Sequence, residues 1–411
     1  MKELWVFTRQ YPQGTSEVFL ESAMPVWAKH FDKVRVIPMF EAPGQVHLPD
    51  GVEELRLWKG QDAFRPLSLL GSIRKTVHLI RLLRERGDAR WRSVAQAREA
   101  IGHVRQLMRK VDILDGRLMP MYDPERVTML CIWMEDWVTV LALLKQRHPA
   151  LHFASMAHRW DLFADRREGG RIPFRDLQVR AVERVLCISE EGAGYLKASY
   201  PKAESRITTV NLGTIDHGKA PWTPNTTLRI VSCAYLRPPK RVDLLASALR
   251  HVTIPVLWTH FGDGEYRMEL ERMIAELPGN ITVALKGTVG NAQVMQWYRE
   301  NPVDLFVHLS DHEGVPVALM EAAGFGIPLM ANKVGGVAEV VTASSGILLD
   351  PAPDPKEIAV QLERFSSSPQ GNLSFRSTVR HFWEQHFHAE GNSRAILDRL
   401  MVPAIGPARG A

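Results

Sequence analysis

Short apolar runs alternate along the chain with longer segments whose apolar residues recur at helical spacing. The short runs are typical of buried parallel strands, and the longer segments predict amphipathic helices. In the first half this pattern predicts strands at 4–8, 33–40, 128–134, 151–157, 184–189 and 207–211. The helices expected between them lie at 17–31, 136–146 and 190–199.

The second half repeats the same alternation after a Gly- and Pro-containing stretch at 213–227, the best linker candidate. We predict strands at 228–235, 255–261, 281–285, 305–309, 327–331 and 346–350. Helices are expected at 241–250, 265–277, 292–301, 355–366 and across 375–400. Alternation of this kind indicates an α/β protein with parallel, doubly wound sheets in two domains. We place these at 1–217, with a helical insertion at about 65–112, and at 218–375, followed by helices at 376–411.

The most informative segment is 305–340, where an apolar run ends in Ser310 and a polar loop reaches Glu313. Pro316 suits the first turn of a helix, and Glu321 follows about two turns after Glu313. Two carboxylates therefore flank a helix N-terminus at the carboxyl end of a strand, where open α/β sheets bind ligands. The N–H group of Val317 would suit a phosphate there, and a carboxylate would suit sugar hydroxyls.

The ordered motif in this segment resembles the donor-site signature of the retaining family 4 glycosyltransferases of bacterial polysaccharide and lipopolysaccharide assembly. The matching residues are Ser310, Glu313, Gly314, Pro316, Glu321, Ala322, Gly326, Pro328, Val334, Gly335, Gly336 and Glu339. The resemblance implies the GT-B fold, with two Rossmann-like domains facing each other across a cleft. It also implies that Glu313 holds the donor sugar, that Glu321 holds the ribose, and that the backbone of 314–317 (Gly314, Val315, Pro316 and Val317) lies against the donor.

Further up the second half, Lys240 matches the family's lysine, which holds the donor diphosphate. Such a cation would stabilise the charge that develops on the leaving group. Tyr235 stands where the family has an arginine. Either Arg237 or Arg241 would then reach the phosphates, or both are surface residues, and the sequence leaves this open.

Two other loops of the second half also resemble the family. Gly262 and Gly264 match glycines that line the sugar pocket, although a Gly-x-Gly pair also occurs in ordinary turns. Lys286 falls where the family's backbone packs on the nucleobase. In the last helices, Trp383 and Phe387 are the expected anchors that return to the first domain.

The first half matches the family more thinly. His158 falls at a strand end within a pattern similar to the family's His-Gly-x-Asp, with Arg159 in the glycine's place, and the resemblance implies that it faces the donor sugar. The opening loop keeps Gly14 where the family has paired glycines. Ser16 and Glu17 in that loop resemble the Ser-Glu pattern of polysaccharide-assembly members.

The net charge of +5 is unevenly spread. The segment from Arg74 to Lys110 contains eleven basic and three acidic residues, a local charge of +8, so the rest of the chain is slightly acidic. Basic amphipathic helices of this kind bind anionic membrane surfaces, but most charge runs are solvated helix faces, and both readings stay open. Nucleic acid is a poorer partner, because the segment has one tryptophan, Trp91, and no recognition module.

The remaining composition indicates a cytoplasmic protein, peripheral on the inner face of the cell membrane if the basic segment binds lipid. Hydrophobic content is 45%, the three cysteines are widely spaced, and there is neither an apolar run long enough to span a membrane nor a signal-peptide core.

We therefore expect transfer of a sugar from a UDP- or GDP-sugar to a glycan or lipid-linked glycan, with retention. No cofactor is expected beyond the donor, and no metal, because the chain lacks an Asp-x-Asp triplet. The alternatives are a non-hydrolysing sugar-nucleotide epimerase of the same fold and a catalytically silent nucleotide-sugar-binding protein.

Overall fold

The computed structural model describes residues 1–14, 17, 19–44, 47–58, 73–86, 93–167, 170–368 and 372–401. It divides into two compact units, Met1–Val210 with Ser393–Ala411, and Asn211–Asn392. The first change of unit thus lies a few residues before the expected position at 217/218. The last change lies inside the final helix instead of at 375/376.

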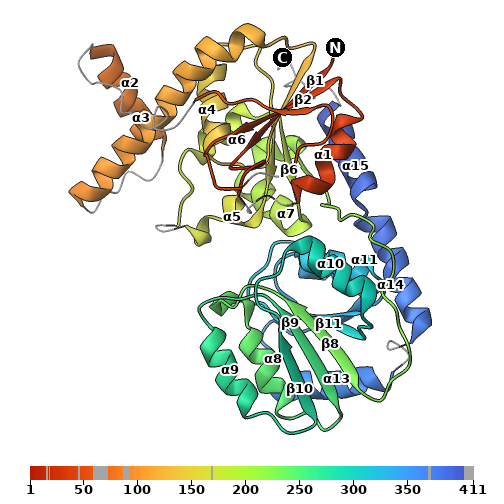
Figure 1. Cartoon of the computed structure of the whole chain (residues 1–411). Coiled ribbons are helices and arrows are strands. Elements are labelled where there is room, and N and C mark those ends of the chain that lie inside the picture. The colour runs from red at the N-terminus through yellow and green to blue at the C-terminus, as the bar shows by residue number, and fades with distance from the viewer. Residues whose placement is uncertain are drawn as a thin grey trace. The chain divides into compact units, whose positions relative to one another are not determined.

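The first unit (Figure 1) contains a parallel seven-stranded sheet in the order β3-β2-β1-β4-β5-β6-β7. Its strands are β1 (Glu3–Thr8), β2 (Lys33–Pro38), β3 (Val52–Glu54), β4 (Val127–Cys131), β5 (Ala154–Ala157), β6 (Arg184–Cys187) and β7 (Ile207–Thr209). The expected strands are confirmed, and β3 is additional. This edge strand is three residues long and only half-buried, so it carries no apolar run by which to predict it.

The longer helices of the first unit are α1 (Leu20–Ala28), α2 (Ile73–Glu85), α3 (Val94–Arg117), α4 (Asp136–Lys145), α6 (Arg175–Ala181) and α7 (Glu190–Ser199). The short α5 (Arg159–Leu162) follows β5. Helix α6 was not predicted. Its buried face includes Arg175 and Gln178 beside Leu177 and Val179, and this mixture hides the helical period.

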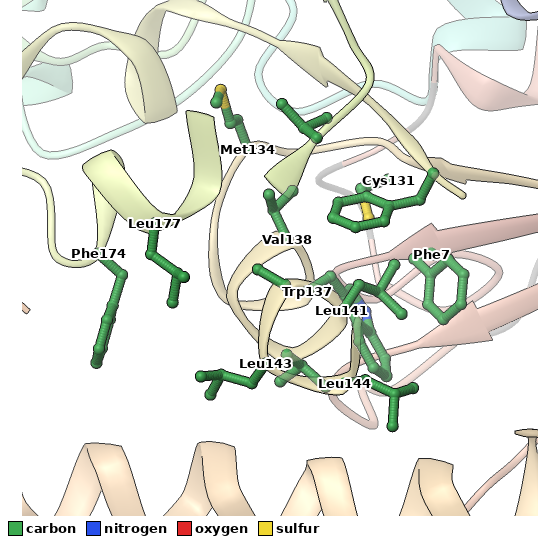
Figure 2. Packing of buried hydrophobic residues seen from close by; sticks show 14 of the residues in the cluster. Phe7, Cys131, Met134, Trp137, Val138, Leu141, Leu143, Leu144, Phe174 and Leu177 are labelled. Atoms are coloured by element: carbon green, nitrogen blue, oxygen red, sulfur yellow. The ribbon is translucent and has the colours of Figure 1, made fainter. Parts of the chain in front are cut away.

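Helix α4 lies at the centre of the core of this unit (Figure 2). Trp137, Val138 and Leu141 project from it toward Phe7 of β1 and Cys131 of β4. The Trp137 and Phe7 rings meet edge to face with centroids 5.0 Å apart. Each fully buried side chain of this size contributes about 1.5–3 kcal/mol. Because this packing holds both strands, it also holds the loops that follow them.

The basic segment is only partly exposed. Arg81, Arg84 and Arg98 face solvent, whereas Arg105 and Arg109 are half-buried. Lys110 is 2% exposed, with its ammonium group 5.1 Å from the ring centroid of Phe40 and 5.8 Å from that of Trp58. The charge that the sequence concentrates at 74–110 is therefore larger than the charge that α2 and α3 present at the surface.

The second unit contains a parallel six-stranded sheet in the order β10-β9-β8-β11-β12-β13. The strands are β8 (Leu228–Cys233), β9 (Val256–Phe261), β10 (Ile281–Leu285), β11 (Leu305–His308), β12 (Leu329–Asn332) and β13 (Gly346–Leu349), as predicted. In both sheets the order reverses once, between β1 and β4 and between β8 and β11. Doubly wound sheets bind ligands at the carboxyl end of the strands at such a reversal.

Two groups of helices cover this sheet (Figure 1). One comprises α8 (Val242–Leu249), α9 (Arg267–Ala275) and α13 (Pro355–Ser366), and the other includes α11 (Val317–Gly324) and α14 (Leu373–His386). Helices α10 (Asn291–Glu300) and α12 (Val337–Val340) complete the unit, and α15 (Ala389–Met401) begins in it and continues into the first.

Trp383 and Phe387, the expected anchors on the first domain, contact Thr214, which lies within the expected bounds 1–217 but in the second unit of the structure. Trp383 Nε1 donates to Thr214 Oγ1 at 2.8 Å, and the Phe387 carbonyl accepts from the Thr214 amide at 2.9 Å. A Cβ on Gly324 would lie 3.0 Å from the Trp383 ring. Both residues therefore tie α14 to the linker at 213–227, and Trp383 also packs against α11.

Candidate functional site

The reversal of the second sheet brings together two residues 73 positions apart. Lys240 ends a 3₁₀ turn, Pro238–Lys240, after β8, and Glu313 lies in the loop after the neighbouring β11. Lys240 Nζ donates to Glu313 Oε1 at 2.6 Å. The lysine side chain stays 30% exposed and the carboxylate 11% exposed, so the pair is reachable from solvent at the edge where a ligand is expected.

His308, the last residue of β11, is buried beneath this pair. Its Nε2 lies 2.8 Å from Glu313 Oε1 and 3.0 Å from Ser310 Oγ. Burial alone would raise the pKa of Glu313, but the hydrogen bond with His308 and the charge of Lys240 lower it to about 2. Glu313 is therefore an ionised hydrogen-bond acceptor at neutral pH. His308 was not among the predicted site residues, although a polar residue that ends an apolar strand is a usable signal.

The two candidate arginines differ in their partners. Arg241 adopts the left-handed conformation, with φ of 45°, and its guanidinium lies 3.1 Å from Asp311 and 3.4 Å from Asp243. Arg237 is exposed, and its guanidinium lies 5.5 Å from the ring centroid of Tyr235. Within the described part of the chain no carboxylate forms an ion pair with Arg237. Of the two, Arg237 is the cation still available to a ligand.

Gly262 and Gly264 let the loop after β9 pass closely against the loop after β8. Gly262 has φ of 136°, and a Cβ there would lie 1.9 Å from the Ala234 carbonyl oxygen. On Gly264 a Cβ would lie 2.4 Å from the Leu236 carbonyl oxygen. A packing role thus accounts for both glycines. Lys286 is exposed, and its amide donates to the His260 carbonyl at 2.9 Å, which ties the loop after β10 to β9.

The loop from Gly314 leads into α11, whose N-cap is Pro316 and whose first residue is Val317, so Pro316 directly precedes the first turn in which it was expected. The Gly314 carbonyl accepts from the Gly336 amide at 3.0 Å, and a Cβ on Gly336 would lie 2.7 Å from the same oxygen. Val315 is buried. The close approach of the two glycine-containing loops fixes the direction of the helix N-terminus, whose first N–H groups have no partner within a helix.

Glu321, in the last turn of α11, is half-buried and accepts from Asn291 Nδ2 at 2.9 Å. Burial raises the pKa of this carboxyl to about 7, and the hydrogen bond from Asn291 opposes the shift only in part. The same unit thus holds one carboxylate with a lowered pKa, Glu313, and one carboxyl with a raised pKa. Raised values of this kind cluster at functional sites, where a ligand supplies the missing donors.

In the first unit, Glu17 shapes the loop after β1. Its buried carboxylate accepts from the amides of Arg9, Gln10 and Tyr11 at 2.9, 2.7 and 2.8 Å, and from Trp133 Nε1 at 2.7 Å. The contacts of Glu17 therefore account for it as an organiser of the loop. Gly14 has φ of 67°, which favours glycine. Ser16 lies outside the described residues.

His158 is buried at the start of α5. Its amide donates to Asp161 Oδ1 at 2.6 Å, and its Nε2 lies 3.0 Å from the Ile132 carbonyl oxygen, which makes Nε2 the donor. Burial lowers the pKa of the imidazole to about 4. Its ring centroid lies 4.4 Å from that of Trp133. The histidine is therefore neutral and held in place, and Arg159 in the glycine's position begins the helix without strain.

A cavity of about 280 Å³ lies beside the carboxyl ends of β1, β2 and β4. Its aromatic lining consists of Phe40, Trp133, Trp137 and Trp160. Glu135, also in the lining, accepts from Arg9 Nη1 at 3.3 Å and from Arg167, whose guanidinium lies 4.4 Å from the Trp160 ring centroid. Aromatic faces with charged groups beside them suit a sugar ring. This pocket was not predicted from the sequence, although tryptophans that follow strands are a signal for it.

Comparison with known proteins agrees with this arrangement. Residues 218–381 match the family model described as Glycosyl transferases group 1. The matched residues all lie in the second unit. In the parts of the chain that the structure describes, no helix combines the length and apolarity needed to cross a membrane.

Among curated relatives, WcaL of Escherichia coli K12, named provisionally as a colanic acid biosynthesis glycosyltransferase, is 26% identical over 50% of this chain and 54% of its own length. AmsK of Erwinia amylovora, an amylovoran biosynthesis glycosyltransferase, is 28% identical over 42% and 45%. The chain spans about half the length of these curated relatives.

Among solved structures, Anabaena HepE in complex with UDP has a TM-score of 0.66 at 16% identity, with 97% of this chain and 99% of that chain covered. The likeness shows the fold, and the chain has the GT-B fold of two Rossmann-like domains. These matches favour neither the epimerase nor the silent binding protein.

Proposed function

We propose that the chain is a retaining glycosyltransferase of family 4 that moves a sugar from a nucleotide-sugar donor to an acceptor hydroxyl in bacterial exopolysaccharide, capsule or lipopolysaccharide assembly. The observation that carries this proposal is the cluster of Lys240, Glu313 and His308 at the reversal of the second sheet. A buried ionised carboxylate beside an exposed ammonium group suits a donor that has both sugar hydroxyls and a diphosphate.

In this proposal each residue of the cluster has a separate task. Lys240, with Arg237, balances the charge that grows on the nucleoside diphosphate as it leaves, so no metal is required for that purpose. Glu313 accepts from donor-sugar hydroxyls, and His308 holds it in place. Glu321 accepts from the ribose hydroxyls, which would supply the donors that its raised pKa indicates are missing.

The aromatic pocket of the first unit is the proposed site of the acceptor glycan. Its tryptophans offer faces to a sugar ring, and Glu135 and Arg9 offer an acceptor and a donor to hydroxyls. His158, which is neutral and fixed, would supply an uncharged polar contact to the donor sugar and would not act as an acid at neutral pH.

The decisive experiment has two steps. The wild-type protein is first titrated with UDP and GDP by calorimetry, and its reaction with UDP-glucose and GDP-mannose is then followed by proton NMR. We expect one nucleoside diphosphate to bind. Slow hydrolysis of the matching sugar donor should release first the anomer with the donor's own configuration. Binding of neither nucleotide would contradict the proposal. Release of the opposite anomer would contradict retention, and an epimeric nucleotide sugar would identify an epimerase.

We further propose that α2 and α3 dock the first unit on an anionic membrane surface, on the inner face of the cell membrane. Exposed Arg81, Arg84 and Arg98 carry the proposal, at about 1 kcal/mol for each basic residue near the surface. Replacing all three by glutamine should release the protein from phosphatidylglycerol vesicles in a salt-dependent way, while UDP binding stays unchanged. Replacing Arg250, Arg272 and Arg364, exposed arginines of the second unit, is the matched control. Equal vesicle binding by both triple variants would refute docking through these helices.

A further inference from the structure

A second cavity of the first unit, of about 260 Å³, is lined by the C-terminal ends of α2 and α7 and the start of α6. It shares the lining residue Ile172 with the aromatic pocket, so the two cavities are neighbours. The proposed transfer reaction assigns no role to this cavity. Its lining differs from that of the aromatic pocket, because three arginines contribute to it: Arg86, Arg171 and Arg175.

Arg175 is the most deeply buried of these arginines, at 7% exposure. One of its terminal nitrogens, Nη2, donates to the Asp161 backbone carbonyl. Its Nε and Nη1 are also buried, and among the described residues they have no hydrogen-bond partner. A buried guanidinium with two unsatisfied nitrogen donors is costly unless a ligand or ordered water accepts from it.

Two acidic groups near Arg175, those of Asp161 and Asp176, are engaged elsewhere. The Asp161 carboxyl accepts from the amides of Met134 and His158, both at 2.6 Å. Burial raises its pKa to about 7, so it is a weak counterion for Arg175 at neutral pH. In the lining itself, Asp176 accepts from the Tyr200 hydroxyl at 2.9 Å.

The lining contains three guanidinium groups and two carboxylates, those of Glu85 and Asp176. Glu85 Oε1 lies 3.8 Å from Arg81 and 3.9 Å from Arg180, which do not line the cavity. A neutral donor is also present, because the Tyr195 hydroxyl oxygen accepts from the Ala164 amide at 3.2 Å and its own proton is available to a ligand. A compact oxyanion would offset the charge of Arg175 and accept hydrogen bonds from its unpaired nitrogens.

We propose that this cavity binds a phosphate group through Arg175 and Tyr195. The phosphate comes either from free phosphate or from a glycosyl phosphate whose sugar extends into the neighbouring aromatic pocket. The second source rests on the proposed function, since it makes the phosphate part of the acceptor. Binding of phosphate itself does not depend on the proposed function, because every residue involved belongs to the first unit.

The test uses the full chain with Lys240→Ala, which removes the cation of the proposed donor site. Inorganic phosphate and glucose 1-phosphate are titrated by calorimetry at constant ionic strength. We expect both to bind, and we expect Arg175→Gln to weaken binding at least tenfold, because it removes the charge and the unpaired donors. Tyr195→Phe keeps the ring and removes only the hydroxyl, and should weaken binding about threefold to tenfold.

Arg126→Gln is the control, because this arginine also belongs to the first unit, is 67% exposed, and neither it nor its ion-pair partner Asp123 lines the cavity. It should bind phosphate as tightly as the parent. Tighter binding of glucose 1-phosphate than of phosphate assigns the site to a glycosyl phosphate, and equal affinity assigns it to free phosphate. Absence of binding in the parent, or undiminished binding in both Arg175→Gln and Tyr195→Phe, would overturn the proposal. UDP binding by the wild-type protein reports separately on the donor site.

Discussion

The two units place polar side chains at the same edge of the same sheet plan, but the groups that they present there differ. In the second unit Lys240, Glu313 and His308 form one cluster, in which Glu313 Oε1 lies within 3 Å of both Lys240 Nζ and His308 Nε2. In the first unit a buried carboxylate of this edge, that of Glu17, already accepts from three backbone amides and from Trp133. What the first unit offers to a ligand is mainly the aromatic pocket.

This difference shows how one sheet plan serves two kinds of ligand. A diphosphate must be met by charge, and the turn after β8 supplies it because Lys240 follows two prolines that hold the turn. A neutral sugar is better met by aromatic faces and a few hydrogen-bonding groups. Substitutions in the second unit should therefore alter donor chemistry, and substitutions in the first should alter acceptor affinity.

The largest expected effect is that of Lys240→Ala. Removing the cation beside the leaving diphosphate should lower kcat about 100-fold, the range for loss of one preorganised electrostatic donor. The donor KM should rise less, because the leaving-group charge grows in the transition state. Steady-state release of nucleoside diphosphate measures both, and the control is Lys356→Ala, at an exposed residue of α13. Unchanged kcat would show that the cluster does not act on the leaving group.

The two carboxyls of the second unit should respond to pH with opposite sign. The pKa of Glu321 in the folded protein, about 7, lies above its usual 4.5, so its stabilising contribution is complete below pH 4.5 and is lost as pH rises through 7. Glu321→Gln should thus gain stability relative to the wild type between pH 5 and pH 8, by up to about 2 kcal/mol once partial exposure is discounted.

For Glu313 the pKa of about 2 lies below 4.5, so its contribution is present above pH 4.5 and is lost as pH falls toward 2. Glu313→Gln should be less stable than the wild type at pH 7, and the difference should shrink in acid. Urea unfolding across pH 3–8 measures both variants. The same pH dependence for the two would contradict the assigned environments.

Arg237 and Arg241 lie at the two ends of the turn Pro238–Lys240 and form a matched pair for substitution. Arg237→Ala should weaken nucleoside diphosphate binding about tenfold, the loss of one exposed charge-assisted hydrogen bond. Arg241→Ala should leave it nearly unchanged, because that guanidinium is already paired with Asp243 and Asp311. Calorimetry with UDP or GDP decides between them. A larger loss for Arg241 would show that its ion pairs open when the donor binds.

The smallest effect is expected in the aromatic pocket. Trp160 is 52% exposed, and its loss should remove stacking worth about 0.5–1.5 kcal/mol. Trp160→Ala should therefore raise the acceptor KM about threefold to tenfold with the donor KM unchanged. Leu373→Ala, an exposed apolar residue of the second unit, is the control. A changed donor KM with an unchanged acceptor KM would reverse the assignment of the two units.

Several features of the candidate site depended on the position of side chains and were outside the reach of sequence patterns. The motif at 305–340 predicted that Glu313 follows a buried strand, but the 2.6 Å contact with Lys240 arises only because β8 and β11 are neighbours. The same holds for Arg237 and Arg241, which are equivalent in sequence and differ in their partners. Periodicity also missed β3 and α6, which lack a clean apolar pattern.

By itself the sequence determined the α/β alternation, the order of the strands along the chain, the loops that carry Lys240 and Glu313 and the helix that carries Glu321. These follow from local spacing, since burial of one face sets the period of each element. Only the tertiary structure decided that Lys110 is buried and that Trp383 stays within the second unit. It also decided that Arg175 meets a cavity. The reason is physical: burial and charge pairing depend on which distant segments meet, and no local period records that.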